Sequence, residues 1–145
     1  MSQPIVMRPV SPADESYLLA LRQRTMDEHF ARLDEVPTKD AHLERLRDHY
    51  GDIRVIHVDD RPVGMVKAYR GAAEWENSQV QIAPEHQGKG LGEQVVRLLL
   101  ADAKRDAVPV TLRVLTGNPA RRLYERLGFV EFEGSDRGAT LIWRP

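Results

Sequence analysis

A glycine-rich segment, residues 87–92, constrains the fold of this chain more than any other feature. It follows an apolar strand pattern and precedes an amphipathic helix pattern. Glycines stand at every second position of the segment: Gly88, Gly90 and Gly92. Glycine permits positive φ and lets a ligand approach the backbone closely, and N–H groups at a helix start bind anions such as phosphate. The segment therefore predicts a strand–loop–helix unit that is either a phosphate-type anion site or an ordinary tight turn.

Two common nucleotide-binding patterns do not fit this segment. The Walker pattern needs Ser or Thr directly after its lysine, whereas Gly90 follows Lys89 here. The dinucleotide pattern G-x-G-x-x-G is absent, and no β–α–β unit with a following acid is evident. The strand–loop–helix order still suits a phosphate site, so the anion interpretation stands without either nucleotide-binding class.

The composition is that of one globular domain covering residues 1–145. The net charge is -1, so no strong field attracts nucleic acid or a membrane surface. The chain has no cysteine, which excludes disulfides, thiolate metal sites and a cysteine nucleophile. No apolar run reaches the roughly 18 residues of a membrane span, and the first residues lack a signal-peptide pattern. We therefore expect a cytoplasmic protein.

Hydrophobic periodicity predicts the α/β (α+β) class, with a mixed, mostly antiparallel central sheet of about six to seven strands flanked by about four helices. Apolar and alternating runs place the strands at 5–8, 53–58, 63–70, 74–83, 108–115, 129–132 and 140–143. Helical spacing places the helices from the cap Ser11 to Leu33 with a break, from the cap Thr38 to Gly51, from the glycine-rich segment to about Asp106, and from Asn118 to Gly128.

A second segment, residues 118–129, has the pattern of a capped amphipathic helix that ends at a glycine and continues into a strand. Taken alone, Tyr124 is best explained as a half-buried core residue. Asn118 is best explained as the N-cap of the helix. Neither explanation accounts for a phenol downstream of an anion-binding loop.

Together the two segments resemble the GCN5-related N-acetyltransferase (GNAT) superfamily. The first matches that family's Gln/Arg-x-x-Gly-x-Gly/Ala motif with Gln87, Gly90 and Gly92. The second matches its Leu-Tyr-x-x-x-Gly-Phe pattern with Leu123, Tyr124, Gly128 and Phe129. The resemblance is strong over residues 79–130. It is weaker over the first seventy residues, where the element order is still consistent with the GNAT fold.

The resemblance implies acetyl-CoA as co-substrate, with no metal. Its pyrophosphate would bind the backbone N–H groups of residues 87–92, with Glu93 opening the next helix. Its pantetheine arm would run beside the preceding strand, in which Val80 and Ile82 share one face and Gln79 and Gln81 the other. Backbone hydrogen bonds from this strand would polarise the thioester carbonyl. The cofactor-binding residues implied in this way are Val80, Gln81, Ile82, Gln87, Gly88, Lys89, Gly90, Leu91, Gly92, Glu93, Asn118 and Tyr124.

The family's reaction is direct attack of a neutral amine on the thioester, without a covalent enzyme intermediate. Tyr124 matches the family tyrosine that donates a proton or a hydrogen bond to the leaving thiolate. A base or a water chain must take a proton from the amine. Glu76, near the start of the strand that enters the loop, is the candidate base, with a solvated strand-edge acid as the other explanation. Glu28 and His29 are further candidates in the N-terminal helices.

The sequence departs from the family pattern at one place. Many relatives carry an asparagine seven residues before the tyrosine, in contact with the cofactor. Gly117 stands at that position here, and Asn118 follows one residue later. Asn118 is therefore expected either to contact the pantetheine or only to cap its helix.

The leading prediction is an acyltransferase, an acetyl-CoA-dependent N-acetyltransferase that acts on a primary amine. The alternative is a non-catalytic acyl-CoA-binding or regulatory module on the same fold. The acceptor is expected to be a small-molecule or peptide amine, and a homodimer is compatible with this function. Four acids of the N-terminal helices would attract a cationic amine or simply be solvated: Asp27, Glu28, Asp34 and Glu35.

Overall fold

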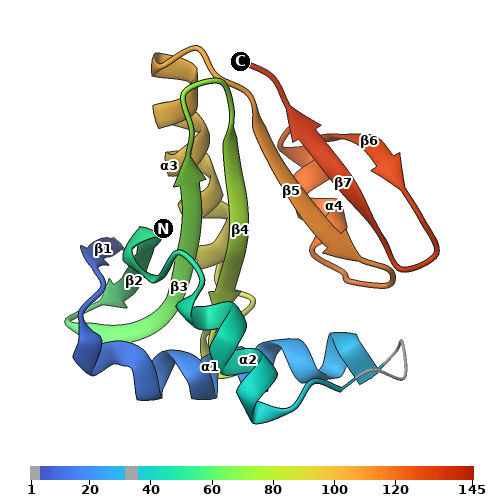
Figure 1. The fold of residues 1–145 in the computed structure, drawn as a ribbon. Helices are drawn as coiled ribbons and strands as arrows, with labels where there is room; N and C mark the ends of the chain where they lie inside the picture. Colours follow the sequence, from blue (N-terminus) through green and yellow to red (C-terminus); the bar gives the residue numbers. More distant parts are fainter. Residues whose placement is uncertain (1–3, 32–35) are drawn as a thin grey trace. The chain divides into compact units, whose positions relative to one another are not determined.

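The computed structural model describes residues 4–31 and 36–145, without the side chains of residues 28 and 29. Within these residues, seven strands form one mixed sheet in the order β1-β2-β3-β4-β5-β7-β6 (Figure 1). The strands are β1 (Val6–Pro9), β2 (Ile53–Val58), β3 (Arg61–Arg70), β4 (Trp75–Ile82), β5 (Val110–Leu115), β6 (Val130–Gly134) and β7 (Gly138–Trp143). β4 and β5 pair in parallel, and the pairs β1–β2, β2–β3, β5–β7 and β6–β7 are antiparallel. The predicted mixed, mostly antiparallel sheet is confirmed.

Four α-helices accompany the sheet in the described part of the chain: α1 (Glu15–Ala31), α2 (Lys39–Arg47), α3 (Leu91–Arg105) and α4 (Arg121–Arg126). Ser11 caps the 3-10 turn that leads into α1, as predicted, and its N–H donates to Asp14 Oδ2 (2.8 Å). α1 lacks the predicted break and runs continuously to Ala31. The predicted end of the helix, at Leu33, lies outside the described residues. None of the helices described here has the length and apolarity needed to cross a bilayer.

α2 begins where predicted but ends earlier than predicted. Thr38 is its cap, because the Thr38 side chain accepts from the Ala41 N–H (3.1 Å). The predicted stop at Gly51 is wrong, because Asp48 turns to extended backbone (ψ 121°) and His49 takes the left-handed position (φ 52°) that was expected of the glycine. Tyr50 therefore lies in a short 3-10 turn and not in the helix.

Two hairpins are tighter than predicted. β3 begins at Arg61, because Asp59 and Asp60 alone form the turn, both at positive φ (51° and 63°). β6 and β7 extend toward each other, so that only residues 135–137 separate them. The predicted turns at residues 59–62 and 134–138 were therefore too long by two residues each.

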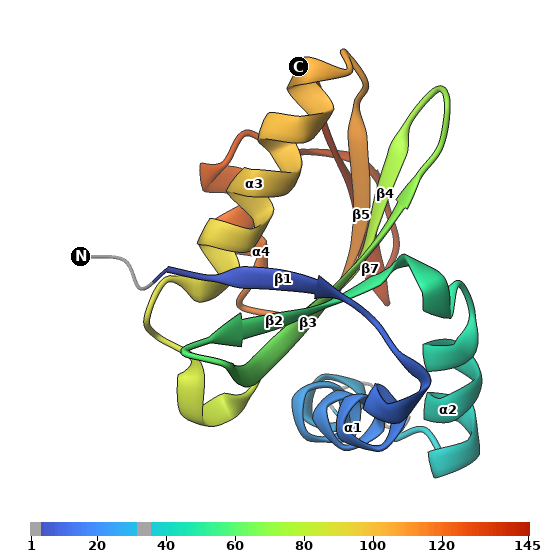
Figure 2. The same ribbon diagram turned by 90° about the vertical axis from the view of Figure 1, so that its left-hand side faces the viewer.

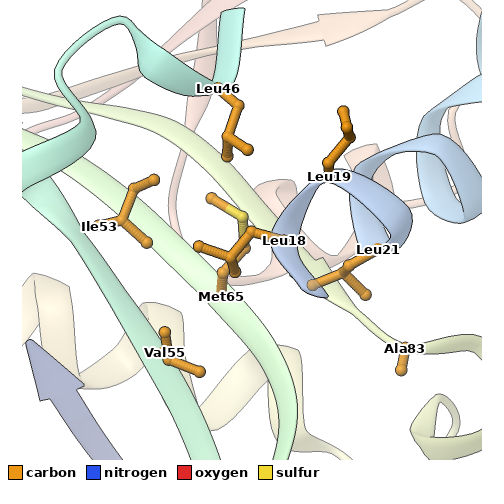
Figure 3. Close-up of a cluster of buried hydrophobic side chains, with 8 residues drawn as sticks. All are labelled: Leu18, Leu19, Leu21, Leu46, Ile53, Val55, Met65 and Ala83. Atoms are coloured by element: carbon orange, nitrogen blue, oxygen red, sulfur yellow. The ribbon is translucent and has the colours of Figure 1, made fainter. Parts of the chain in front are cut away.

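The chain forms two compact units, Met1–Lys67 with Gln79–Gly92 and Ala68–Ser78 with Glu93–Pro145. In the first unit, α1 and α2 lie on the same side of β1, β2 and β3 (Figure 2). Leucines of α1 and α2 meet apolar residues of β2 and β3 in one buried cluster (Figure 3), which contains Leu18, Leu19, Leu21, Leu46, Ile53, Val55, Met65 and Ala83. Each large side chain of this kind contributes about 1.5–3 kcal/mol when buried. This cluster fixes the two helices against the strands.

The second unit is built around the antiparallel ladder of β5, β7 and β6, with the start of β4 paired in parallel to β5. Gly138 has to be a glycine, because a Cβ there would lie 2.4 Å from the Val114 carbonyl oxygen. Alternate residues of the ladder are buried: Val110, Leu112, Val114, Ala139 and Leu141. The buried side chains of this ladder form the apolar core of the second unit.

Candidate functional site

The end of β4 has two unlike faces. Val80 and Ile82 are half-buried on one face, whereas Gln79 and Gln81 on the other face are only 8% and 4% exposed. The predicted alternation is confirmed, but the polar face is the more deeply buried one. Gln81 Nε2 donates to Gln79 Oε1 (3.3 Å), while Gln79 Nε2 and Gln81 Oε1 are buried without a partner among the described residues. Each unpartnered buried group costs about 1–3 kcal/mol, so packing alone does not explain this pair.

The loop that follows β4 is shaped by contacts of its own. A 3-10 turn, Pro84–His86, leads out of the strand, and Gln87 Nε2 donates back to the Ile82 carbonyl (2.9 Å). Gly88 and Gly90 have φ angles of 79° and 78°. Glycine enters this region without steric cost. Backbone conformation therefore explains two of the three glycines, as it would in an ordinary tight turn.

Gly92 needs a different explanation. It lies in the first turn of α3, its φ is not positive, and a Cβ there would meet only Ile82 Cγ1, at 3.8 Å. That distance is an ordinary van der Waals contact, and alanine would favour the helix by about 1 kcal/mol. The glycine therefore keeps free a space that the first unit does not use for its own packing.

The loop offers backbone N–H groups to a ligand. Among the described residues, the N–H groups of Gly88, Lys89 and Gly90 donate to no backbone carbonyl, whereas that of Gln87 donates to the Pro84 carbonyl (3.3 Å). The first N–H groups of α3 have no acceptor within the helix either. Together with the helix dipole and the exposed Lys89, these groups favour an anion. The loop thus fits the phosphate groups of an acyl-CoA.

Glu93, in the first turn of α3, has its carboxylate held by two arginines of the second unit. Arg126 lies 2.7 Å and Arg97 3.3 Å from its oxygens. These hydrogen bonds, that of Arg126 first, lower the pKa of Glu93. Because the side chain is engaged, the part of Glu93 available to an anion is its backbone N–H.

Tyr124 is a buried residue of α4, with 9% of its surface exposed. Gly128 ends the helical segment at a φ of 104° and turns the chain back. Phe129 then packs edge-on against the Tyr124 ring, with the centroids 5.7 Å apart. Burial raises the pKa of Tyr124 to about 12. The phenol is therefore protonated at neutral pH and can donate a hydrogen bond.

Asn118 lines a cavity of about 440 Å³ in the second unit, together with Gly117 and Arg121. Its Oδ1 accepts from the Ala120 N–H (2.9 Å), and α4 begins only at Arg121. Asn118 thus closes a turn before the helix and is not the N-cap that the sequence predicted. This contact uses only the side-chain oxygen, so among the described residues the Nδ2 group is still available as a donor.

Comparison with known proteins connects these features to a family. Residues 49–131 match the model of the acetyltransferase (GNAT) domain. The chain belongs to the GNAT family. The match includes the glycine-rich loop and the segment around Tyr124, so it covers both motifs on which the resemblance was based.

Three relatives illustrate the likeness. A GCN5-like protein acetyltransferase of Mycobacterium tuberculosis is 37% identical in an alignment of 78 positions that covers 48% of this chain and 38% of that relative. The crystal structure of an acetyltransferase from Thermus thermophilus has a TM-score of 0.78 at 24% identity, over 100% of both chains. That of PaiA N-acetyltransferase from Thermoplasma acidophilum, in complex with coenzyme A, has a TM-score of 0.77 at 16% identity, over 98% of this chain and 99% of that one. The matched region spans less than half of the first relative, and the two structures show a common GNAT fold.

The predicted base of this GNAT chain, Glu76, is an exposed residue of β4 in the second unit. It stands opposite Thr111 in the parallel β4–β5 pair. An exposed carboxylate can accept a proton, and a solvated strand-edge acid has the same surroundings. Both explanations of Glu76 therefore stay predictions.

Of the four acids expected to attract a cationic amine, only Asp27 has a described side chain. Asp34 and Glu35 lie outside the described residues, as do the side chains of Glu28 and His29. Asp27 is described, and its Oδ1 lies 2.6 Å from His42 Nε2. Asp27 is thus paired with a buried imidazole, while 40% of its own side chain is exposed.

Three polar residues buried in the first unit of this GNAT domain were not predicted from the sequence: Arg22, His42 and Lys67, at 5%, 1% and 3% exposure. Arg22 follows Leu18 by four residues and therefore shares the apolar face of α1. Lys67 follows Val63 and Met65 at alternate positions of β3, again on a buried face. A charged residue in phase with an apolar face was the signal that could have revealed both.

Proposed function

We propose that this GNAT family member is an N-acetyltransferase that transfers the acetyl group of acetyl-CoA to a primary amine by direct attack in a ternary complex. The observation that carries this proposal is the loop after β4, where the N–H groups of Gly88, Lys89 and Gly90 find no backbone acceptor in the described part of the chain. Gly92 adds a space that the protein's own packing leaves unused. The coenzyme A complex of the PaiA enzyme, which shares this fold, supports the use of an acyl-CoA.

The roles of the binding residues follow from the groups they present. The N–H groups of residues 88–93 would hold the pyrophosphate. The backbone of Val80, Gln81 and Ile82 would bond to the pantetheine arm, and Asn118 Nδ2 would be a further donor to it. Acetyl-CoA would supply an activated acetyl group and a thiolate leaving group.

Two side chains would handle protons. Tyr124, protonated because burial raises its pKa to about 12, would donate its phenolic proton or a hydrogen bond to the leaving thiolate. Glu76, directly or through a water, would accept a proton from the attacking amine. Because a neutral tyrosine is the active form, ionisation of Tyr124 would not limit the rate near neutral pH.

Thiol release from acetyl-CoA over a panel of primary amines tests the proposal. We expect Tyr124→Phe to lower kcat at least tenfold, because it removes a proton donor that acts in the transition state. Its dissociation constant for acetyl-CoA should stay within about twofold of the wild-type value, because the phosphates bind elsewhere. The matched control is Tyr69→Phe, which removes the same hydroxyl from an exposed position of β3. Glu76→Gln separates a base from a strand-edge acid, since turnover would slow only if the substitution removes the base.

Each result has a defined meaning. Acetyl-CoA binding without turnover on any amine would replace the enzyme with an acyl-CoA-binding or regulatory module. A full rate in Tyr124→Phe would remove Tyr124 from the mechanism. If acetyl-CoA does not raise the melting temperature of the wild-type protein, the loop is not its site and both functions fail.

A further inference from the structure

Arg22 is a buried cation that forms no ion pair with a carboxylate in the described part of the chain. It is 5% exposed, and its Nε donates to His42 Nδ1 (3.1 Å). No carboxylate among the described residues forms an ion pair with it. Arginine is almost never buried this far unless it is paired. Burial lowers the pKa of Arg22 to about 10, so it still carries its charge at neutral pH.

The neighbours of Arg22 hold it in one orientation. His42 receives the Arg22 Nε hydrogen on Nδ1, and its Nε2 lies 2.6 Å from Asp27 Oδ1. Because Nδ1 accepts the Arg22 hydrogen, Nε2 is the ring nitrogen that donates to Asp27 Oδ1. Phe30 packs edge-on against the imidazole, with the ring centroids 6.5 Å apart. These contacts use one Arg22 N–H and fix the plane of the guanidinium.

The surrounding charges act on Arg22 in both directions. After burial, repulsion from Arg45 lowers the pKa of Arg22, and attraction by Asp27 raises it. Arg22 in turn acts against the charge of Lys67. Lys67 Nζ donates to the carbonyls of Arg45 (2.9 Å) and Leu46 (3.0 Å), and also to that of Asp48. Its protons are thus committed to the end of α2, whereas the two Nη groups of Arg22 have no partner in the described part of the chain.

We propose that the Nη edge of Arg22 binds a carboxylate of the acceptor, which makes the acceptor an amine that also carries a carboxylate, as amino acids do. This inference rests on the proposed acetyltransferase function. Two parallel N–H donors of a guanidinium match the two oxygens of a carboxylate. A dianionic phosphate would need a second cation, but Lys67 has no proton left for one and Arg45 is paired with Asp48 (3.8 Å).

A purely structural role for Arg22 makes the opposite prediction about stability. If Arg22 served only to hold the fold, Arg22→Met would weaken it. A buried charge kept for a ligand destabilises the free protein, so its replacement by an apolar side chain of similar length is neutral or stabilising. Arg22→Met removes this desolvated charge but also the donor to His42 Nδ1, so it should melt near the wild-type temperature.

The experiment compares standard L-amino acids with their carboxamides, which differ only in the carboxylate. With acetyl-CoA as donor, the wild-type protein should prefer the acid over the amide of the same amino acid at least tenfold in kcat/KM. In Arg22→Met this ratio should fall to about one, and the dissociation constant for acetyl-CoA should change less than about twofold. Arg22→Lys should retain part of the preference. Arg47→Met, which removes an exposed arginine of α2 paired with Glu15, should retain all of it.

Several outcomes overturn the inference. They are equal use of acids and amides by the wild-type protein, an unchanged preference in Arg22→Met, or a preference for O-phosphoethanolamine over β-alanine. A loss of folding in Arg22→Met would contradict the expected stability. In that case the acid-to-amide ratio of the wild-type protein and the ratio of Arg22→Lys decide whether Arg22 binds the carboxylate. If no amine releases thiol, the acetyltransferase function fails. Calorimetry of the same acids and amides on the wild-type protein then tests carboxylate binding alone.

Discussion

The glycine-rich loop and the buried network of Arg22, His42 and Asp27 belong to the same compact unit, yet they prepare for a ligand in opposite ways. The loop leaves N–H groups and space unused at the surface, which costs the fold little. The network places a buried cation where α1 meets α2, so the same groups that await a ligand also affect stability. Substitutions in the loop should therefore change binding at little cost to the fold, whereas those in the network should also change stability, in either direction.

His42→Leu is the substitution that should have the largest effect. It leaves the Arg22 Nε and the Asp27 carboxylate without their common partner, in a site where His42 is 1% exposed. We expect the free energy of unfolding in urea to fall by about 3 kcal/mol. The folded protein should bind acetyl-CoA as tightly as wild type. The control His57→Leu, at a half-buried position of β2, should lose much less. A parallel loss of acetyl-CoA affinity would contradict the separation of the two regions.

Lys67→Met should have the next largest effect. Methionine fills the volume of the lysine stem but leaves the carbonyls at the end of α2 without a donor, at a cost of about 2 kcal/mol. The difference depends on pH. Burial lowers the pKa of folded Lys67 from 10.5 to about 8, so between these values the unfolded chain binds more protons. The stability of wild type relative to Lys67→Met should therefore rise across that window. Urea unfolding of both proteins at several pH values measures it, and a fall would show that the charge itself is stabilising.

The same contrast explains what the sequence could predict. The loop, the Thr38 cap and β2 depend on neighbouring residues, and their pattern is local. The end of α2 is not local, because His49 takes the left-handed position and Lys67, from another element, donates to the last carbonyls of the helix. The network around Arg22 depends on how α1 and α2 pack. The donor half of the proposed reaction was thus visible in the sequence, whereas the network around Arg22 was not.

Gly92→Ala tests the loop with a smaller change. The added Cβ meets only Ile82 Cγ1 at 3.8 Å, and alanine favours the helix by about 1 kcal/mol. The variant should melt at or above the wild-type temperature but bind acetyl-CoA about tenfold more weakly, because the methyl group occupies the space kept for the phosphates. Titration calorimetry measures this affinity. Gly51→Ala, whose Cβ meets nothing within 4 Å, is the matched control. Wild-type affinity in Gly92→Ala would mean that the space has no role in binding.

The amide pair of β4, Gln79 and Gln81, combines features of the loop and of the buried network, and its replacement should have the smallest effect. Gln79→Leu alone leaves Gln81 Nε2 without its acceptor, and Gln81→Leu leaves Gln79 Oε1 without its donor. Replacing both removes every unpartnered amide atom of the pair. The double variant should therefore be more stable than either single variant, by about 1 kcal/mol, with a clear coupling in a double-mutant cycle. If the double variant is the least stable of the three, ordered water already satisfies the amides and the pair is structural. If it is the most stable but turns over more slowly, the buried amides resemble Arg22, being kept for the ligand at the expense of the fold.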